Sequence, residues 1–469
     1  MSDELWRWDA TRLATAIRLG NISSREAVTA SLKRLDAVNG AVNAVTVVRA
    51  DEALAAADEA DRAVKHGELL GPLHGVPVTI KENADQAGVA TTSGVVAFQD
   101  LIAASDSPPV ANWKRAGAIV IGRTNAAAFS LRWHTDNDLR GLTLNPWDKA
   151  RTPGGSSGGA AAALALGITP LAHGSDYGGS IRYPAYCCGL AGIRPTLGRV
   201  PTFNGTARDE LSLTGQLFSV EGLLARRVCD IRLGLAAMAA RDMRDPWWAP
   251  APLTGPEPVR PIRVALTVDP AGQGVDPVVA AAVRRAGAAL ERAGYAVDDV
   301  DPPAVDATAE LWWRMVWTET RQMLAPTIRT LGGKDINRAL DVYLASTPSI
   351  DLTGYMKDVA QRATHIRDWL RFLERYPLVV GPVSTEPPFP VGFDTDDAAD
   401  AERQKRAQRL LITVNLLGLP AATAPTGVSD GVPLGVQIIG SRYREDLCLD
   451  AAEAIEARCG LDTPIDVRW

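Results

Sequence analysis

The chain has 469 residues, of which 46% are hydrophobic and 22% charged, the composition of a folded globular protein and not of a disordered one. A net charge of −6 argues against a nucleic-acid surface, which would need clustered lysine and arginine. No apolar run reaches the ~20 residues that span a bilayer, and the acidic N-terminus is unlike a signal peptide. We therefore expect a cytoplasmic protein with neither a membrane nor a nucleic acid as partner.

Short apolar runs alternate with helical patterns along the chain. Ser23 and Glu26 form a capping box that predicts the start of an N-terminal helix. The strands that we predict lie at 44–48, 76–80, 118–121, 262–267, 378–380, 422–425 and 432–439. Helices are predicted at 51–64, 276–294 and 445–458, and the segment 310–376 is predicted to be helical throughout. This alternation predicts an α/β fold, with a parallel or mixed sheet covered by helices on both faces.

A proline-rich segment at 244–261, with six prolines, permits two interpretations. It is either a linker between domains or a long loop that crosses one large domain, and the sequence leaves both open.

Cysteine and histidine patterns bear on cofactors. The five cysteines include no CxxC pair, which favours free thiols over a disulfide framework or a zinc site. The five histidines never fall at HxxxH or HExxH spacing. We expect neither a metal nor an organic cofactor.

Two glycine-rich turns with serines stand out between residues 152 and 196. The first reads GGSSGG at 154–159, and the second reads GSDYGGSIR at 174–182. Glycines permit backbone conformations closed to other residues and let peptide N–H groups approach a reacting atom. A phosphate loop would need a lysine that is missing here, and a GxGxxG fingerprint is absent. G-x-S-x-G matches a nucleophile elbow, but the preceding segment is loop-like, and only His173 or His365 could serve as its base.

The long pattern closely resembles the amidase signature family, whose hallmark is GGSSGG followed at a fixed distance by G-[ST]-D-x-G-G-S-[IV]-R. Ser180 follows Ser156 by 24 positions, the spacing of that family. Further matching blocks are VTIKEN at 78–83, GRTN at 122–125, NPW at 145–147, NLLGLP at 415–420 and PLGVQIIG at 433–440. The resemblance implies one α/β/α domain over residues 1–469 with a twisted mixed central sheet. Within it we expect an N-terminal helical segment to about 70, a signature core at about 75–240 and a C-terminal part at about 260–469.

The resemblance also implies a catalytic triad. Ser180 would be the nucleophile, Lys81 the base, and Ser156, after a cis peptide bond from Gly155, the proton relay, with Ser157 in a supporting role. The chemistry agrees, because a serine hydroxyl is a poor nucleophile until a base takes its proton. A buried lysine can be that base, since burial disfavours its charged form.

The turn before Ser180 would stabilise the oxyanion. The donors that we expect are the backbone N–H groups of Tyr177, Gly178, Gly179 and Ser180, each worth ~3–4 kcal/mol in such sites. Asp176 and Arg182 are expected to brace the turn through buried hydrogen bonds and not to touch substrate.

Several residues depart from the family pattern. Tyr177 stands where relatives have threonine or a small residue, and Ala128 where they often have glutamate. His173 replaces a small or apolar residue, and Tyr186-Cys187 replace a more usual Ala-Phe. These departures affect substrate choice and not the reaction type. The side chain of Tyr177 is expected to lie beside the acyl site and contact substrate. The tryptophans Trp312, Trp313 and Trp317 are interpreted both as core residues and as candidate walls of an apolar substrate pocket.

The predicted function is hydrolysis of a linear amide through a serine acyl-enzyme, acting on an apolar aryl or alkyl amide and also on carbamates or esters. The partners are then a small amide substrate and water, and the protein is a monomer or homodimer. One alternative is a glutamine-hydrolysing subunit of a tRNA-dependent amidotransferase; another is a catalytically silent binding protein. A third hypothesis keeps the hydrolysis but makes His173 the base.

Overall fold

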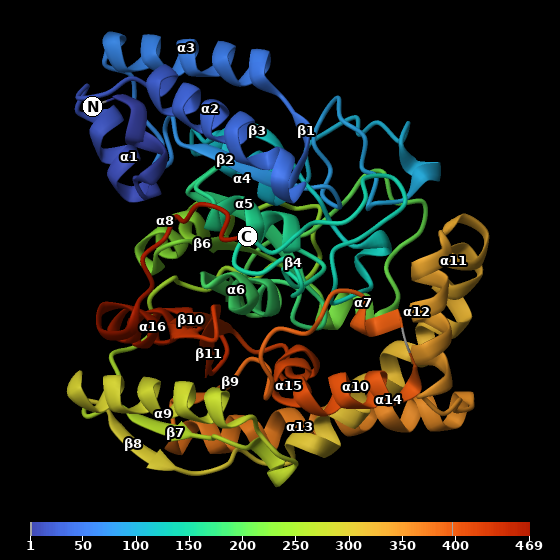
Figure 1. Cartoon of the computed structure of the whole chain (residues 1–469). Coiled ribbons are helices and arrows are strands. Elements are labelled where there is room, and N and C mark those ends of the chain that lie inside the picture. The colour runs from blue at the N-terminus through green and yellow to red at the C-terminus, as the bar shows by residue number, and fades with distance from the viewer. Residues whose placement is uncertain (1, 396) are drawn as a thin grey trace.

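The computed structural model describes residues 2–395 and 397–469. Within these residues one mixed sheet of 11 strands runs through the molecule, in the order β1-β3-β2-β4-β6-β5-β10-β11-β9-β7-β8 (Figure 1). The strands are β1 (Val45–Val48), β2 (Pro77–Lys81), β3 (Ile119–Thr124), β4 (Leu171–Asp176), β5 (Ala191–Arg194), β6 (Val220–Ala225), β7 (Arg263–Leu266), β8 (Ala296–Asp299), β9 (Leu378–Pro382), β10 (Ala421–Ser429) and β11 (Val432–Gly440). β2 pairs in parallel with β3 and β4, and β7 with β8 and β9, whereas the other pairs are antiparallel.

Helices make up most of the rest of the chain. They are α1 (Ala10–Arg18), α2 (Ser24–Val42), α3 (Ala50–His66), α4 (Pro108–Arg115), α5 (Gly158–Ala165), α6 (Arg182–Cys188), α7 (Leu213–Phe218), α8 (Val228–Met238), α9 (Pro277–Arg292), α10 (Val305–Glu319), α11 (Ala325–Leu331), α12 (Lys334–Ala345), α13 (Leu352–Arg375), α14 (Ala398–Ala407), α15 (Arg409–Leu417) and α16 (Glu445–Cys459). Short helical segments are η1 (Ser2–Arg7), η2 (Val96–Phe98), η3 (Ala128–Ser130), η4 (Pro270–Gly272), η5 (Thr320–Leu324) and η6 (Phe393–Thr395).

The helices form a layer on each face of the sheet. One apolar core joins α1, α4, α8, α9 and α16 to side chains such as Val78 and Leu171. The opposite face is covered by α5, α6, α10 and α15 in a second core and by α2 and α3 in a third. The blue N-terminal helices and the yellow segment of α9, β7 and β8 lie at opposite ends of the molecule (Figure 1). This is the predicted single α/β/α domain with a mixed sheet.

The proline-rich segment is a loop of this domain and not a linker, because the strands on both sides of it belong to the same sheet. It is also pinned to the domain: the Ala249 N–H donates to the Gly198 carbonyl, and Arg199 donates to the carbonyl oxygens of Ala251 and Pro252. The further subdivision near residues 70 and 240–260 stays a prediction.

Most predicted elements are confirmed within a few residues, including the capping box at Ser23 and Glu26. The sequence-based prediction missed β4, β5, β6 and β8. The first three are short central strands that contain glycine or polar residues, so neither alternation nor a β-branched run marks them.

The close packing of α5 against the chain after β3 positions the first glycine-rich turn. The sequence of α5 is GGAAAALA, and every residue is buried. A Cβ at Gly159 would lie 2.5 Å from backbone atoms of Asn125, so only glycine permits this approach to the chain after β3. The helix thus brings the residues before it close to the ends of β2 and β4.

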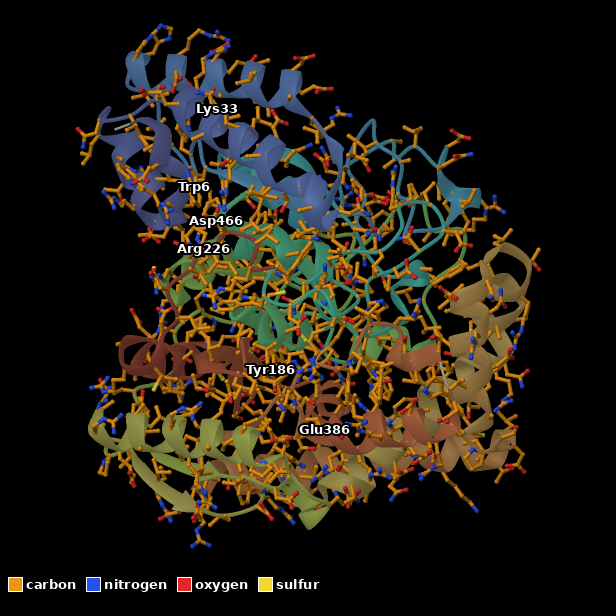
Figure 2. All side chains as sticks on the ribbon, viewed as in Figure 1. Trp6, Lys33, Tyr186, Arg226, Glu386 and Asp466 are labelled. Atoms are coloured by element: carbon orange, nitrogen blue, oxygen red, sulfur yellow. The ribbon has the colours of Figure 1, made fainter. Side chains whose placement is uncertain are left out.

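One side chain of α6 connects the two halves of the chain near the middle of the molecule. The Tyr186 hydroxyl, on α6, donates to the Glu386 carbonyl oxygen after β9 at 3.0 Å (Figure 2).

In the described ranges no helix combines the length and apolarity needed to cross a membrane. Nor do three or more His, Cys, Asp or Glu side chains of the described residues gather as a metal-binding group.

Candidate active site

Lys81, the last residue of β2, is buried between two serines. Its Nζ lies 2.7 Å from Ser156 Oγ and 2.9 Å from Ser175 Oγ. Asn83 Nδ2 also donates to Ser175 Oγ, at 2.9 Å. The ladder between β2 and β4 ends at Thr79 and Ala172, which leaves the end of β2 for this cluster.

Burial lowers the pKa of Lys81 to about 7, although the negative charges of Glu221 and Asp176 oppose this shift. A neutral amine within 2.7 Å of a hydroxyl can accept its proton. The cluster therefore has the geometry that a base with a proton relay requires, and burial favours the neutral form of its amine.

Ser156 and Ser157 stand in the turn that precedes α5. The peptide bond between Gly155 and Ser156 is cis, as the family resemblance implied. Ser157 Oγ donates to the Ser175 carbonyl oxygen at 3.5 Å, which links this turn to β4. Both serines are buried.

Ser180 lies in the second glycine-rich turn, between β4 and α6, and is 6% exposed. Asp176 braces this turn: its carboxylate accepts from Arg182 Nη2 at 3.0 Å and from Asn415 Nδ2 at 2.8 Å. Arg182 also donates to Gln437 Oε1 at 2.8 Å. Burial alone would raise the pKa of Asp176, but Arg182 and Arg194 outweigh burial and hold this pKa well below its usual value. The expected bracing roles of Asp176 and Arg182 agree with these contacts.

One expected oxyanion donor is already engaged. The Gly179 N–H donates to Asp176 Oδ1 at 2.9 Å, because the aspartate folds back beneath the turn. Within residues 2–395 and 397–469, the N–H groups of Tyr177, Gly178 and Ser180 have no protein acceptor. These three are therefore the donors free to meet a substrate oxygen.

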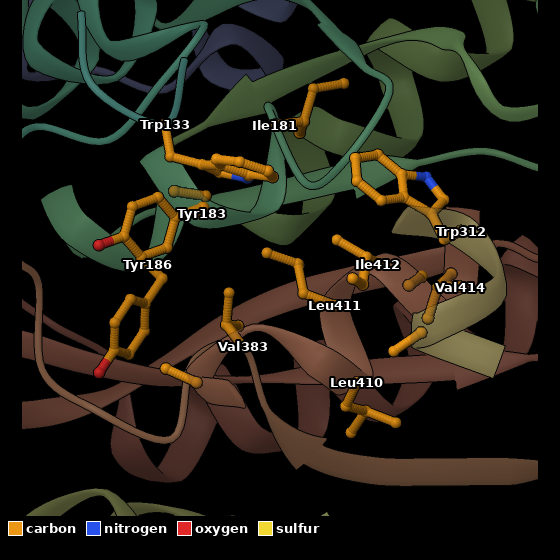
Figure 3. Close-up of a cluster of buried hydrophobic side chains, with 14 of the residues drawn as sticks. Trp133, Ile181, Tyr183, Tyr186, Trp312, Val383, Leu410, Leu411, Ile412 and Val414 are labelled. Atoms are coloured by element: carbon orange, nitrogen blue, oxygen red, sulfur yellow. The ribbon is translucent and has the colours of Figure 1, made fainter. Parts of the chain in front are cut away.

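Two tryptophans enclose the turn at Gly178. Trp133 Nε1 donates to the Gly178 carbonyl oxygen at 2.8 Å. A Cβ at Gly178 would lie 2.9 Å from Trp312 Cζ2 and 3.3 Å from Trp133 Cζ2, so both rings contact the backbone there. The rings lie 6.2 Å apart between centroids, with Leu411 and Ile412 of α15 beneath them (Figure 3). Sequence reasoning missed Trp133, which follows η3 in a loop far from the signature turns.

The other two candidate wall residues pack mainly against other aromatic rings of the same core. Trp313 stacks on Trp317 at 5.9 Å between centroids, and Trp317 stacks on Tyr343 at 4.9 Å. Both belong to the apolar core of this face. Of the three tryptophans predicted to line a pocket, Trp312 is the one in contact with the turn.

Tyr177 is anchored by a buried polar chain. Its hydroxyl lies 2.7 Å from Thr214 Oγ1, which donates to Glu319, and Tyr355 donates to the same carboxylate. Burial raises the pKa of Tyr177 well above its ordinary value, so the phenol is a neutral hydrogen-bond donor. Its ring contacts Trp312 at 5.8 Å between centroids, which joins the second glycine-rich turn to α10.

His173, the rival base, is fully buried and bound elsewhere. Its Nε2 lies 2.8 Å from Glu221 Oε2, on β6. No hydrogen bond in the described part of the chain joins His173 to Ser180 or Ser156.

Comparison with known proteins agrees with this geometry. The family model described as Amidase matches residues 26–449. An indoleacetamide hydrolase of Bradyrhizobium diazoefficiens is 49% identical over 462 residues, covering 97% of this chain and 87% of the relative. One glutamyl-tRNA(Gln) amidotransferase subunit, from Moorella thermoacetica, is 34% identical, covering 97% of each chain. The crystal structure of a bacterial aryl acylamidase of the amidase signature family superposes with a TM-score of 0.83 at 26% identity, covering 96% of each chain.

The fold, the buried lysine–serine cluster and these relatives define an amide hydrolase. The chain belongs to the amidase family, whose signature its two glycine-rich turns carry.

Proposed function

We propose that the protein hydrolyses primary arylacetamides, such as indole-3-acetamide, through an acyl-enzyme on Ser180. The observation that carries the proposal is the pair of indole rings, Trp133 and Trp312, packed against Gly178 two residues before Ser180. Aromatic rings favour aromatic partners in offset or edge-to-face contact. The relative named for indoleacetamide hydrolysis, 49% identical, supports the same substrate class.

In the acylation step, Ser180 Oγ attacks the amide carbonyl carbon while its proton passes to Ser156 and the Ser156 proton passes to neutral Lys81. The 2.7 Å contact between Lys81 and Ser156 supports this relay. The N–H groups of Tyr177, Gly178 and Ser180 receive the developing oxyanion. The tetrahedral intermediate collapses, and ammonia leaves with the proton returned from Lys81 through Ser156.

In the deacylation step, water attacks the acyl-enzyme, giving its proton to Lys81 by the same relay. Ser180 then regains a proton as the arylacetic acid departs. Asp176 and Arg182 keep the turn in place throughout without touching substrate.

The test is a panel of amides compared by kcat/KM: indole-3-acetamide, phenylacetamide, acetamide, acetanilide and glutamine. Because an apolar pocket gains roughly 0.8 kcal/mol per buried CH2, the indole compound should exceed acetamide by at least ~100-fold. Preference for acetanilide would place the aryl group on the leaving side, and preference for glutamine would favour the amidotransferase role of the 34% identical relative. Either result would contradict the proposal.

We further propose that the enzyme works in the cytoplasm as a monomer or homodimer. Five cysteines without a disulfide support a reducing compartment. Light scattering of the purified protein tests the oligomeric state, and a larger assembly would contradict it.

A further inference from the structure

His173 and Glu221 form a buried pair of an imidazole and a carboxylate on β4 and β6, near Lys81 at the end of β2. His173 on β4 contacts Glu221 on β6 at 2.8 Å, and Thr202 Oγ1 donates to the other carboxylate oxygen at 3.3 Å. Glu221 is 8% exposed. Across the described ranges, neither lysine nor arginine forms a salt bridge with it. Among the described residues, His173 Nδ1 is buried and has no hydrogen-bond partner, so Glu221 is the group that holds the ring.

The register of the two strands places this pair next to Lys81. β4 and β6 are antiparallel, with Ser175 opposite Glu221 and His173 opposite Leu223. Side chains opposite each other, and those two positions apart, share a face of the sheet. Ser175, His173 and Glu221 therefore lie on one face, and Ser175 Oγ is 2.9 Å from Lys81 Nζ.

The other charges on the strands around Lys81 are compensated. Asp176 of β4 is paired with Arg182 and Arg194. Glu82, after β2, is paired with Arg140 at 3.0 Å.

The remaining neighbours add no negative charge. Arg123 of β3 donates to the carbonyl oxygens of Lys81 and Ala84. Among the helices that pack on β2, α5 has no ionisable side chain, and the buried residues of α2 have none either. Of the two carboxylates that act on Lys81, Asp176 and Glu221, only Glu221 lacks a salt bridge with arginine or lysine among the described residues.

The sign of its effect follows from electrostatics. A carboxylate favours the protonated form of a nearby amine. Burial lowers the pKa of Lys81 to about 7, and Glu221 gives the largest opposing contribution. Without this charge, the lysine would lose its proton at a lower pH.

We propose that Glu221, held by His173, is a positioning residue that sets the pH range in which Lys81 is free to accept a proton. Among the described residues no hydrogen bond joins Glu221 to Ser180; Glu221 acts through its charge on Lys81 and through its place beside Ser175. This inference rests on Lys81 as the base proposed above.

The experiment measures the rate of inactivation by a fluorophosphonate probe between pH 5 and 9, which requires no knowledge of the natural substrate. Glu221→Gln keeps the size of the side chain and removes its charge. Its rate midpoint should move about one pH unit below that of the unmodified enzyme, since a nearby opposite charge shifts a pKa by ~1–3 units. The matched control is Glu445→Gln, which neutralises a buried carboxylate paired with Arg199 and should leave the midpoint in place.

Two further variants separate charge from packing. His173→Gln retains a donor and the Glu221 charge, so its midpoint should move less than half as far. The double variant His173→Leu, Glu221→Leu replaces both partners by apolar side chains and guards against a single variant that does not fold. It should show the same downward shift as Glu221→Gln.

An unchanged or higher midpoint in Glu221→Gln, or in the double variant if the single one fails to fold, would overturn the inference. A shift in His173→Gln as large as that in Glu221→Gln would also overturn it, because packing would then be the cause. Failure of the proposed base is distinguishable: Lys81→Ala would then be labelled at the normal rate with an unchanged pH profile.

Discussion

The indole N–H of Trp133 donates to the carbonyl oxygen of Gly178 at 2.8 Å, two residues before Ser180. This hydrogen bond has two structural effects. It fixes the orientation of a peptide unit in the turn that carries the free N–H groups, and it holds an aromatic ring against the site. The loop after η3 therefore contacts the turn of the proposed active site, although it carries no signature residue.

Trp133→Phe removes this hydrogen bond and keeps most of the aromatic surface. A net hydrogen bond is worth about 1 kcal/mol, so kcat/KM on an arylacetamide should fall by about 5- to 10-fold. Trp113→Phe is the matched control, since Trp113 Nε1 donates to the Gly234 carbonyl at 2.9 Å in the core on the other face. The control should lower the melting temperature and leave kcat/KM unchanged. Equal kcat/KM losses in the two variants would contradict a specific role for Trp133.

Trp312→Leu should change which substrates are preferred. Loss of the ring that packs on Gly178 should lower the kcat/KM ratio of indole-3-acetamide to acetamide by about tenfold, because one large aromatic contact is lost. Trp317→Leu serves for comparison, since Trp317 stacks on Trp313 and Tyr343 instead. It should destabilise the fold without altering the ratio. A larger change of the ratio in Trp317→Leu would contradict the proposed contact between the aryl group and Trp312.

Asp176→Asn tests the support of the turn. Asp176 is fully buried between Arg182 and Arg194, and removing one partner of a buried ion pair costs about 3–5 kcal/mol. Asp450→Asn, in an exposed pair with Arg232, should cost less than about 1 kcal/mol. Urea unfolding measures the free energy of unfolding of both variants.

Because the pKa of Asp176 is depressed in the fold, the stability that this ionised carboxylate contributes should be present above pH ~4 and be lost as pH falls further. Equal costs for the two variants would count against the bracing role.

The sequence predicted the architecture better than the details of the site. The strands β2, β3, β10 and β11 have β-branched or apolar runs that mark them, whereas β4 reads LAHGSD and carries no such signal. The positions of Lys81 and Ser156 relative to each other came from the family resemblance. Spacing alone does not place residues 75 positions apart at 2.7 Å.

The missed site residues share a physical cause. Trp133 contacts a turn and Glu221 contacts a strand residue, His173, that are distant from them in sequence, and neither stands in a motif. The sequence makes His173 a candidate base because it lies seven positions before Ser180. Its partner Glu221 lies on β6, and the pairing of these two residues follows from the antiparallel register of β4 and β6, which the sequence pattern does not give.

The pH dependence of hydrolysis should follow Lys81. Because only the neutral amine accepts a proton, kcat/KM should rise with pH to a plateau, with a midpoint at about 7. An uncharged amide substrate, assayed from pH 5 to 9, keeps substrate ionisation out of the profile. A kcat/KM that still rises about tenfold per pH unit up to pH 9, as expected for an unperturbed lysine with a pKa of ~10.4, would show that burial does not tune this group.

The most direct test of the account is the site and rate of fluorophosphonate labelling, read by peptide mass spectrometry. We predict that the label lies on Ser180 and is absent in Ser180→Ala. Ser156→Ala and Lys81→Ala should each slow labelling by at least ~100-fold, the usual contribution of a general base, and the double variant should be little slower than either. A label on another serine, or normal labelling of Lys81→Ala together with its loss in His173→Ala, would contradict the lysine-based site.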